Sequence, residues 1–228
     1  MPPADRRPVP ATGVGGADGP VDAARGIDLS AVQRRRKLVL AAGIVAAAVL
    51  MPFMAPAVPD GTPLHHAIEW AGTALILTCI AGRTWTALYI SGIKRVALVA
   101  SGPYSVVRNP LYLFSASGAA GAGLWTGSLS AGLALAAIAF AVFHVVALSE
   151  EAFLRLRFGA DFEAYAAEVP RWIPAFGKWR GADWVTIRPS LVTATFLESS
   201  IFLVVIPVLE AVEHLRMAGV LPVLFRLV

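Results

Sequence analysis

Long apolar runs, bounded by polar or basic residues, alternate along most of the chain. A helix needs roughly 20 apolar residues to cross a bilayer, and the pattern predicts an all-α membrane helix bundle with about five transmembrane helices. Their expected ranges are 38–58, 67–81 with a continuation to 92, 111–125, 128–148 and 190–209. The third is short for a crossing and rich in small residues, so we expect it to pack inside the bundle. The last apolar piece, 221–228, is too short to cross.

The N-terminal part of the chain has a different composition. Residues 1–28 hold five Pro and five Gly without periodicity, which is typical of a disordered segment. The first apolar run follows a basic cluster ending at Lys37 and is longer than a signal-peptide core. We therefore expect a disordered cytoplasmic tail over 1–36, a membrane core over 37–176, and a C-terminal extension over 177–228 with one more transmembrane helix.

The basic residues fall on alternate connections. The first 37 residues hold seven Lys or Arg, and six follow the fourth expected helix. The loop after the second expected helix contributes Arg83, Lys94, Arg95 and Arg108. The opposite connections, 57–66 and 124–128, hold none. Because basic loops stay in the cytoplasm, this predicts a bacterial inner-membrane protein with a cytoplasmic N-terminus, five crossings and the C-terminus outside.

The composition also indicates a membrane protein, and it argues against a nucleic-acid partner. The 228 residues are 57% apolar and only 15% charged, with a mean hydropathy of +0.68, which excludes an ordinary soluble domain. The formal charge of +4 is accounted for by the cytoplasmic loops, so we expect an integral membrane protein and no nucleic-acid partner. The single cysteine, Cys79, allows neither an intrachain disulfide nor a cysteine metal cluster.

Two segments expected on the cytoplasmic face carry unusual chemistry. In GPYSVVRNPLY (102–112) the first proline follows a glycine at a turn, and Pro110 suits a helix start near Asn109. The free amides of a helix start favour an anionic group, and two tyrosines add aromatic faces and hydroxyls. The alternative is a plain connector, in which Arg108 meets lipid phosphate and the tyrosines belong to an interfacial belt.

The second segment, 149–174, begins directly after the fourth expected helix. Adjacent carboxylates at Glu150 and Glu151 repel each other and invite a cationic partner. Gly159 can end this helix, and Asp161 can cap a short one after it. These features predict a cytoplasmic amphipathic helical lid lying on the bilayer face. The alternative is an interfacial surface helix with solvated charges.

Together the two segments resemble the signature of the isoprenylcysteine carboxyl methyltransferase and phospholipid methyltransferase superfamily. The shared pattern is G-x-Y-x-x-x-R-[HN]-P-x-Y, later E-E, then F-G-x-x-Y-x-x-Y and a closing P-R-x-x-P. In this chain these are GPYSVVRNPLY, EE, FGADFEAY and PRWIP. The resemblance covers roughly residues 89–174 and is specific for the superfamily rather than for a substrate.

The resemblance implies S-adenosylmethionine bound between the cytoplasmic helix ends and the lid. Glu150 would receive the ammonium group of the methionine moiety, and Tyr89 aligns with a more distant cofactor contact. The implied cofactor-binding residues are Leu98, Val99, Tyr104, Arg108, Asn109, Pro110, Leu111, Tyr112 and Glu150. The reaction would be an in-line methyl transfer to a lipid-like or small hydrophobic acceptor that arrives from the bilayer. Where the acceptor must lose a proton, Glu151 and His144 are the candidate catalytic residues.

Two positions depart from the prenylcysteine enzymes. Asn109 stands where many carboxyl-methylating members have histidine, and Val146 stands where those enzymes hold an arginine for the substrate carboxylate. Both argue against a prenylcysteine acceptor. Two other classes remain open: a membrane reductase of the related sterol-reductase type using NADPH, and a non-enzymatic membrane scaffold or transporter, although no internal repeat supports a transporter.

Glu198 lies well inside the last expected helix, outside the region of resemblance. A carboxylate within a span is costly and often functional, and its alternatives are protonation, pairing with a neighbouring helix, or a place nearer the interface. We expect His65 and His66 in an outer loop and His214 at the outer boundary. No histidine spacing indicates a metal site.

Overall fold

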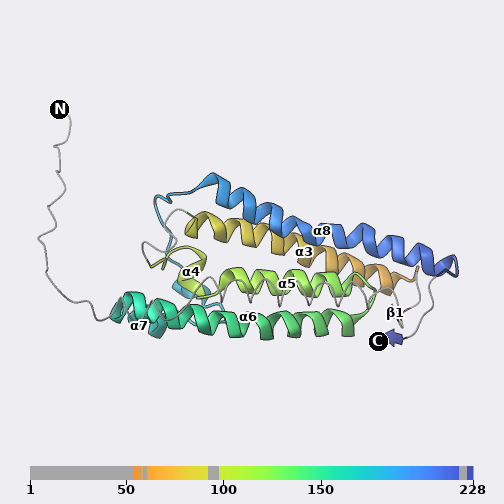
Figure 1. Ribbon diagram of the computed structural model, residues 1–228, viewed down its shortest axis with the longest axis horizontal. Coiled ribbons are helices and arrows are strands. Elements are labelled where there is room, and N and C mark those ends of the chain that lie inside the picture. The colour runs from red at the N-terminus through yellow and green to blue at the C-terminus, as the bar shows by residue number, and fades with distance from the viewer. Residues whose placement is uncertain (1–53, 57, 59–60, 92–97, 221–224, 228) are drawn as a thin grey trace, which may run out of the picture.

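The computed structural model describes residues 54–56, 58, 61–91, 98–220 and 225–227. Four long helices run side by side (Figure 1): α3 (Pro63–Ile90), α5 (Pro110–Leu124), α6 (Leu129–Phe158) and α8 (Pro189–Met217). Helix α5 packs between α3 and α6, and α8 packs on the other side of α3. The expected tail over 1–36 and most of the first expected transmembrane helix lie outside the described residues.

Short elements lie at both ends of the bundle. One end, called the site end below, carries α4 (Pro103–Val106), α7 (Ala160–Glu168) and the 3₁₀ turn η2 (Phe176–Lys178). At the opposite end, β1 (Met54–Pro56) pairs in parallel with β2 (Phe225–Leu227), with Met54 opposite Phe225. The far end of the first expected helix is therefore an extended strand at 54–56, because its backbone pairs with β2.

Three of the described helices are long and apolar enough to cross a membrane: Pro63–Ile90, Leu129–Phe158 and the Pro189–Leu215 part of α8. They correspond to the second, fourth and fifth helices expected from hydropathy. Helix α5 has 15 residues, a length of about 22 Å against a hydrocarbon core of about 30 Å. It packs inside the bundle, as its small residues predicted.

Close backbone approach joins α3 to α5. A Cβ atom placed on Gly121 would lie 2.5 Å from the carbonyl oxygen of Gly72, and one on Gly72 would lie 2.7 Å from the carbonyl oxygen of Gly121. A Cβ on Gly118 would lie 2.7 Å from the sulfur of Cys79. The small residues of α5 therefore let it fit between the longer helices.

Two expectations about α3 were wrong. The helix reaches Ile90, as its expected continuation to 92 indicated, so Arg83 lies inside it and not in the loop to which it was assigned. His65 and His66 lie in its first turn, because Thr62 caps the helix by accepting a hydrogen bond from the His65 backbone N–H at 3.2 Å. A hydropathy pattern finds the apolar middle of such a helix but not its polar ends.

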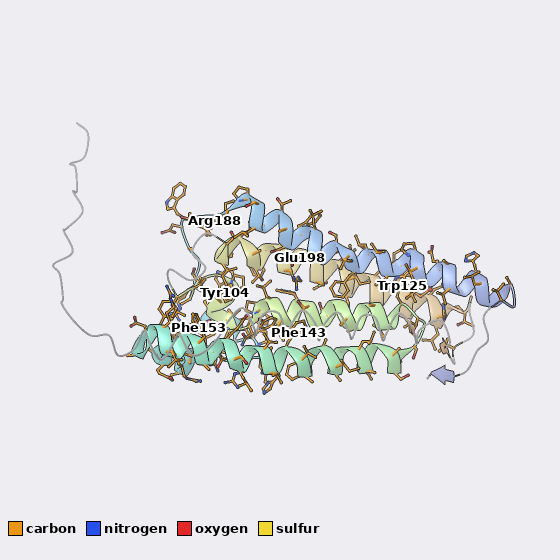
Figure 2. The ribbon with its side chains drawn as sticks, viewed as in Figure 1. Tyr104, Trp125, Phe143, Phe153, Arg188 and Glu198 are labelled. Carbon is orange, nitrogen blue, oxygen red and sulfur yellow. The ribbon has the colours of Figure 1, made fainter. Side chains whose placement is uncertain are left out.

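Arg83 ties three helices together. Its Nε donates to Ser199 Oγ on α8 at 2.7 Å, and its Nη1 donates to Ser115 Oγ on α5. Its Nη2 lies 3.8 Å from the carboxylate of Glu198, which Figure 2 places on α8 partway along the bundle. Glu198 is therefore paired with a residue of the neighbouring helix α3, which is one of the alternatives given for this carboxylate.

Candidate functional site

The turn before α5 is fixed by a close approach of backbone to an aromatic ring. Gly102 has φ +58°, and a Cβ atom there would lie 2.2 Å from the ring of Tyr89. Only glycine combines this left-handed backbone with this contact. The turn leads through α4 to Asn109, which is the N-cap of α5, with Pro110 at the first helical position. The predicted helix start at Asn109 is confirmed.

Helix α6 is longer than hydropathy indicated, and it includes both of the paired acids. It continues without interruption to Phe158, with Gly159 as its C-cap. Glu150 and Glu151 therefore lie inside a helix rather than after its end. Adjacent helical residues point about 100° apart, and the two carboxylates have different surroundings: Glu151 is buried and Glu150 is half-buried.

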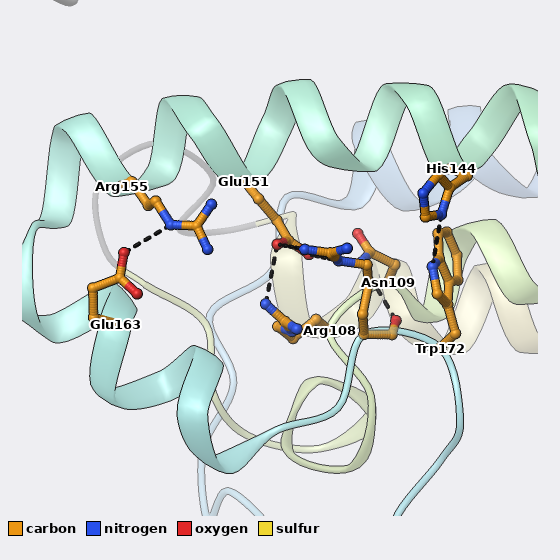
Figure 3. A network of polar contacts seen from close by, with 8 residues as sticks. Arg108, Asn109, His144, Glu151, Arg155, Glu163 and Trp172 are labelled. Atoms are coloured by element: carbon orange, nitrogen blue, oxygen red, sulfur yellow. Dashed lines mark hydrogen bonds and ion pairs between the residues drawn. The ribbon is translucent and has the colours of Figure 1, made fainter.

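Glu151 is the hub of a polar network that joins both sequence motifs (Figure 3). Its side chain is 3% exposed. Arg108 Nη1 donates to its Oε2 at 3.0 Å, and Arg171 donates from Nε to Oε1 at 2.9 Å and from Nη2 to Oε2 at 2.8 Å. Asn109 Nδ2 donates to Oε1 at 3.5 Å. The Arg171 bonds form the paired geometry in which guanidinium and carboxylate groups interact most strongly.

The network carries more positive than negative charge. Two guanidinium groups share the single carboxylate of Glu151. The hydrogen bonds and charge of that carboxylate raise the pKa of Arg171, so its charge is permanent. The Nε atom of Arg108 is buried and has no hydrogen-bond partner among the described residues. The site can therefore accept an anionic group.

Tyr104 is a buried residue of the turn before α5 and is bonded to the helix α7. Tyr104 is buried, and its carbonyl oxygen accepts a hydrogen bond from Tyr165 Oη at 2.9 Å. Burial raises the pKa of Tyr104 well above its usual range, and the nearby Tyr165 and Glu150 raise it further.

Aromatic residues of α5 and α6, together with Trp172, lie beside the network. Tyr112 on α5 stacks on Phe143 of α6, with ring centroids 5.0 Å apart. The indole Nε1 of Trp172 donates to His144 Nδ1 at 3.1 Å (Figure 3), and the Trp172 ring lies 4.9 Å from Phe140. Because an indole N–H can only donate, His144 Nδ1 is the acceptor in this hydrogen bond.

The other predicted site residues lie nearby without joining this network. Leu98 packs against the buried cluster of Phe162, Tyr165 and Val169. Val99 and Leu111 are half-buried and Pro110 is buried. His144 and Glu151, the two candidate catalytic residues, lie about two turns or 10 Å apart along α6. Figure 2 shows Tyr104 and Phe153 at the site end, away from Trp125.

Arg171 and Trp172 were not among the predicted site residues. Both belong to the PRWIP run, which matches the closing P-R-x-x-P motif of the resemblance. The arginine of that motif was the available signal. Its fixed charge needs a carboxylate partner, and the adjacent acids at 150 and 151 needed a cation.

The expectation for the lid was wrong in orientation. Phe162 and Tyr165 of α7, with Val169, form a buried cluster with residues of the 98–100 segment and the end of α6. The apolar face of α7 therefore covers the protein rather than the bilayer. Gly159 is its N-cap, and Asp161 lies in its first turn instead of capping it.

The described residues hold no group of three or more His, Cys, Asp or Glu side chains arranged for a metal ion. The two adjacent histidines of α3 pair with one carboxylate: His65 Nε2 lies 3.3 Å and His66 Nδ1 lies 3.0 Å from the Glu69 oxygens.

The buried tyrosines predict a loss of stability in alkali. Burial raises the pKa values of Tyr104 and Tyr165 above the value near 10 of an unfolded chain. The folded protein therefore keeps two protons that the unfolded chain releases, so stability is complete below about pH 10 and falls as pH rises above it. Unfolding free energies between pH 8 and 11 should show this fall, with a smaller slope in Tyr165→Phe.

Phenolate absorbance supplies the matching readout. Of the four tyrosines, Tyr104 and Tyr165 should ionise only as the protein unfolds. Ionisation of all four near pH 10 in the folded protein would contradict this.

Comparisons with known proteins agree with the geometry. The profile of the phospholipid methyltransferase family matches residues 69–161. The chain is 36% identical over 163 residues to the cobalt-zinc-cadmium resistance protein CzcN of Cupriavidus metallidurans, covering 71% of this chain and 74% of that protein. It is 33% identical over 163 residues to the nickel-cobalt-cadmium resistance protein NccN of Alcaligenes xylosoxydans xylosoxydans, covering 72% and 76%. No solved structure matches the chain. The chain belongs to the phospholipid methyltransferase family.

Proposed function

We propose that the protein is a membrane-embedded S-adenosylmethionine-dependent methyltransferase that acts on a lipid-like or small hydrophobic acceptor. One observation carries the proposal: Arg108 and Asn109 at the start of α5 bond directly to Glu151 of α6. The two motifs of the family resemblance thus form one site rather than two surfaces. The distribution of basic residues supports a cytoplasmic position for this site end.

The residues present fit the amino-acid part of the cofactor. The positive surplus at Arg108 and Arg171, with the first amides of α5, suits its carboxylate. Glu150, half-buried on α6 next to Glu151, suits its ammonium group. Tyr104 and Tyr112 offer aromatic surface for the nucleoside. When bound, S-adenosylmethionine supplies a methyl group on a positively charged sulfur.

In this proposal Glu151 positions the site rather than accepting a proton. Both of its oxygens accept bonds from guanidinium groups, so it holds Arg108 and Arg171 in place. His144 Nδ1 accepts from Trp172, which leaves Nε2 as the ring nitrogen that can contact the methyl acceptor. The protein would contribute mainly orientation and exclusion of water.

The acceptor is proposed to arrive from the bilayer. Phe140 is 41% exposed on α6 and contacts Trp172, which in turn bonds to His144. This aromatic run leads from the lipid-facing side of α6 toward the network. Val146 is buried where the prenylcysteine enzymes hold an arginine, so we propose an acceptor without a carboxylate at that point.

Calorimetry on the purified full chain tests the cofactor. S-adenosylhomocysteine should bind, and Glu150→Gln should weaken it about tenfold or more, because a buried ammonium loses its charge partner. Glu163→Gln is the matched control, since Glu163 pairs with Arg155 on an exposed surface and should leave affinity unchanged. Absence of binding, or binding of NADPH in its place, would refute the proposal.

An assay of methyl transfer tests whether the protein is a methyltransferase. Membranes from the native host, incubated with a radiolabelled methyl donor with and without the protein, should gain a labelled product in the lipid or small-molecule fraction. A protein that binds the cofactor but labels nothing would support the non-enzymatic scaffold.

The two relatives named for metal resistance suggest a cellular role. We propose that the methyl transfer contributes to resistance to divalent metal ions indirectly, because the described residues form no three-ligand metal group. A deletion strain should be more sensitive to cadmium, cobalt or zinc, and the Glu150→Gln variant should fail to restore growth. Restoration by that variant would separate resistance from methyl transfer.

A further inference from the structure

A segment here called the strap (residues 170–188) crosses the site end. It is bound along its length to the turn that precedes α5. The backbone N–H of Arg108 donates to Pro170 O at 2.9 Å, and that of Ala175 donates to Val106 O at 2.9 Å. The N–H of Gly102 donates to Arg180 O at 2.7 Å. The path of the strap is therefore fixed relative to the bundle.

The strap exposes three large apolar side chains. Ile173 is 81%, Phe176 is 77% and Trp184 is 93% exposed. This is the reverse of α7, whose aromatic residues Phe162 and Tyr165 are buried against the protein. Several large apolar side chains exposed on one short segment indicate that the segment contacts something other than water.

Two contacts, and the chain connection to α8, fix the level of the strap relative to the membrane helices. Trp179 stacks on Trp85 near the end of α3, with ring centroids 5.7 Å apart. The backbone N–H of Arg188 donates to Ser91 Oγ, just beyond α3, at 3.3 Å. The next residue, Pro189, begins α8. The strap therefore lies level with the ends of two helices that are long and apolar enough to cross a membrane.

The charged residues of the strap are also consistent with a position level with the ends of the membrane helices. Lys178 donates to the backbone of Glu168, and Arg180 pairs with the Glu168 carboxylate at 2.8 Å. Arg188 stands at the start of α8, and Asp183 is the acidic residue of the strap. Basic and aromatic residues together are typical of the interface between lipid headgroups and acyl chains.

We infer that Ile173, Phe176 and Trp184 insert into the headgroup layer of the bilayer and make the strap the membrane-contacting cover of the site. The occupant of this surface is the lipid interface itself. Trp184 lies within about 17 Å of chain from the start of α8, and indole prefers this interface to both water and hydrocarbon. The inference does not depend on the proposed function.

Tryptophan quenching in lipid nanodiscs tests it. The emission of Trp184 is obtained as the difference between the wild type and Trp184→Phe. It should be quenched about twofold more by lipids brominated near the carbonyl than by lipids brominated near the chain end, and acrylamide should reach it poorly. Trp70→Phe is the matched control, because Trp70 is also exposed but lies near the start of α3, away from the strap.

A tryptophan at a second position of the strap provides a test that does not depend on Trp184 alone. Phe176→Trp in the Trp184→Phe background should show the same preference for shallow bromine. Full quenching by acrylamide with none by bromine would overturn the inference. So would protection from both quenchers together with cross-linked dimers of Trp184→Cys, because a second copy would then cover the strap.

Discussion

Glutamine in place of Glu151 should destabilise the protein by about 3 kcal/mol. The substitution keeps the shape of the side chain but removes its charge, so Arg108 and Arg171 lose the carboxylate they share. Arg108 is 13% exposed, and a guanidinium this buried is costly without a partner. Arg171 is more exposed, so water will offset part of its loss. Unfolding in mild detergent, followed by circular dichroism, measures the difference.

Glu163→Gln is the control for this change. It removes the same charge from another Glu–Arg pair, but both partners are largely exposed, and such pairs contribute about 0–1 kcal/mol. The double variant Arg108→Gln with Glu151→Gln should be less destabilised than the sum of the single variants, because it leaves one fewer unpaired charge. Equal, small effects of Glu151→Gln and Glu163→Gln would show that the buried network contributes little.

Hydropathy predicted the membrane helices because lipid contact requires apolar side chains along their whole middle. It did not predict where those helices end. Helix α6 continues through SEEAFLRLRF to Phe158, since nothing in that polar run stops a helix before Gly159. The pattern marks the boundary of the hydrocarbon, and the backbone hydrogen bonds continue past it. The same reasoning explains why Arg83 was expected in a loop.

The sequence predicted that the two motifs form one site, but it did not show whether Glu150 or Glu151 faces the interior. Glu151 continues the buried stripe of Phe143 and Ala147, which follows the spacing of one helix face. Extending that stripe past the expected end of the helix would have identified Glu151. Glu150 and Glu151 look alike as a pair, and only the helix direction separates them.

The motif arginine is a signal for Arg171, but the path by which the strap brings it to Glu151 could not be predicted from the sequence. The arginine reaches Glu151 from a segment beyond α7, and the return of that segment depends on how α7 packs. This helix was expected to lie on the bilayer face because amphipathic stripes look the same whether they face lipid or protein. The strap has no helical periodicity, so its exposed apolar residues gave no pattern.

Alanine in place of Gly121 should destabilise the bundle by about 2 kcal/mol. The new Cβ atom would lie 2.5 Å from the Gly72 carbonyl oxygen and 3.0 Å from the Ile76 backbone nitrogen, and backbone atoms of a helix cannot yield as a flexible side chain can. Alanine is otherwise favoured over glycine within a helix by roughly 1 kcal/mol. A loss of stability must therefore come from the α3–α5 contact, and thermal unfolding in detergent measures it.

Gly177→Ala is the control, because nothing lies within 4 Å of a Cβ atom at that position, and it should leave stability nearly unchanged. Gly121→Leu should be worse than Gly121→Ala, since a larger side chain separates the helices further. Because α5 begins at Asn109, a shift of this helix would also move Asn109 relative to Glu151. Loss of cofactor affinity should therefore accompany loss of stability in Gly121→Leu, and a fully stable Gly121→Ala would mean that α3 and α5 are not in close backbone contact.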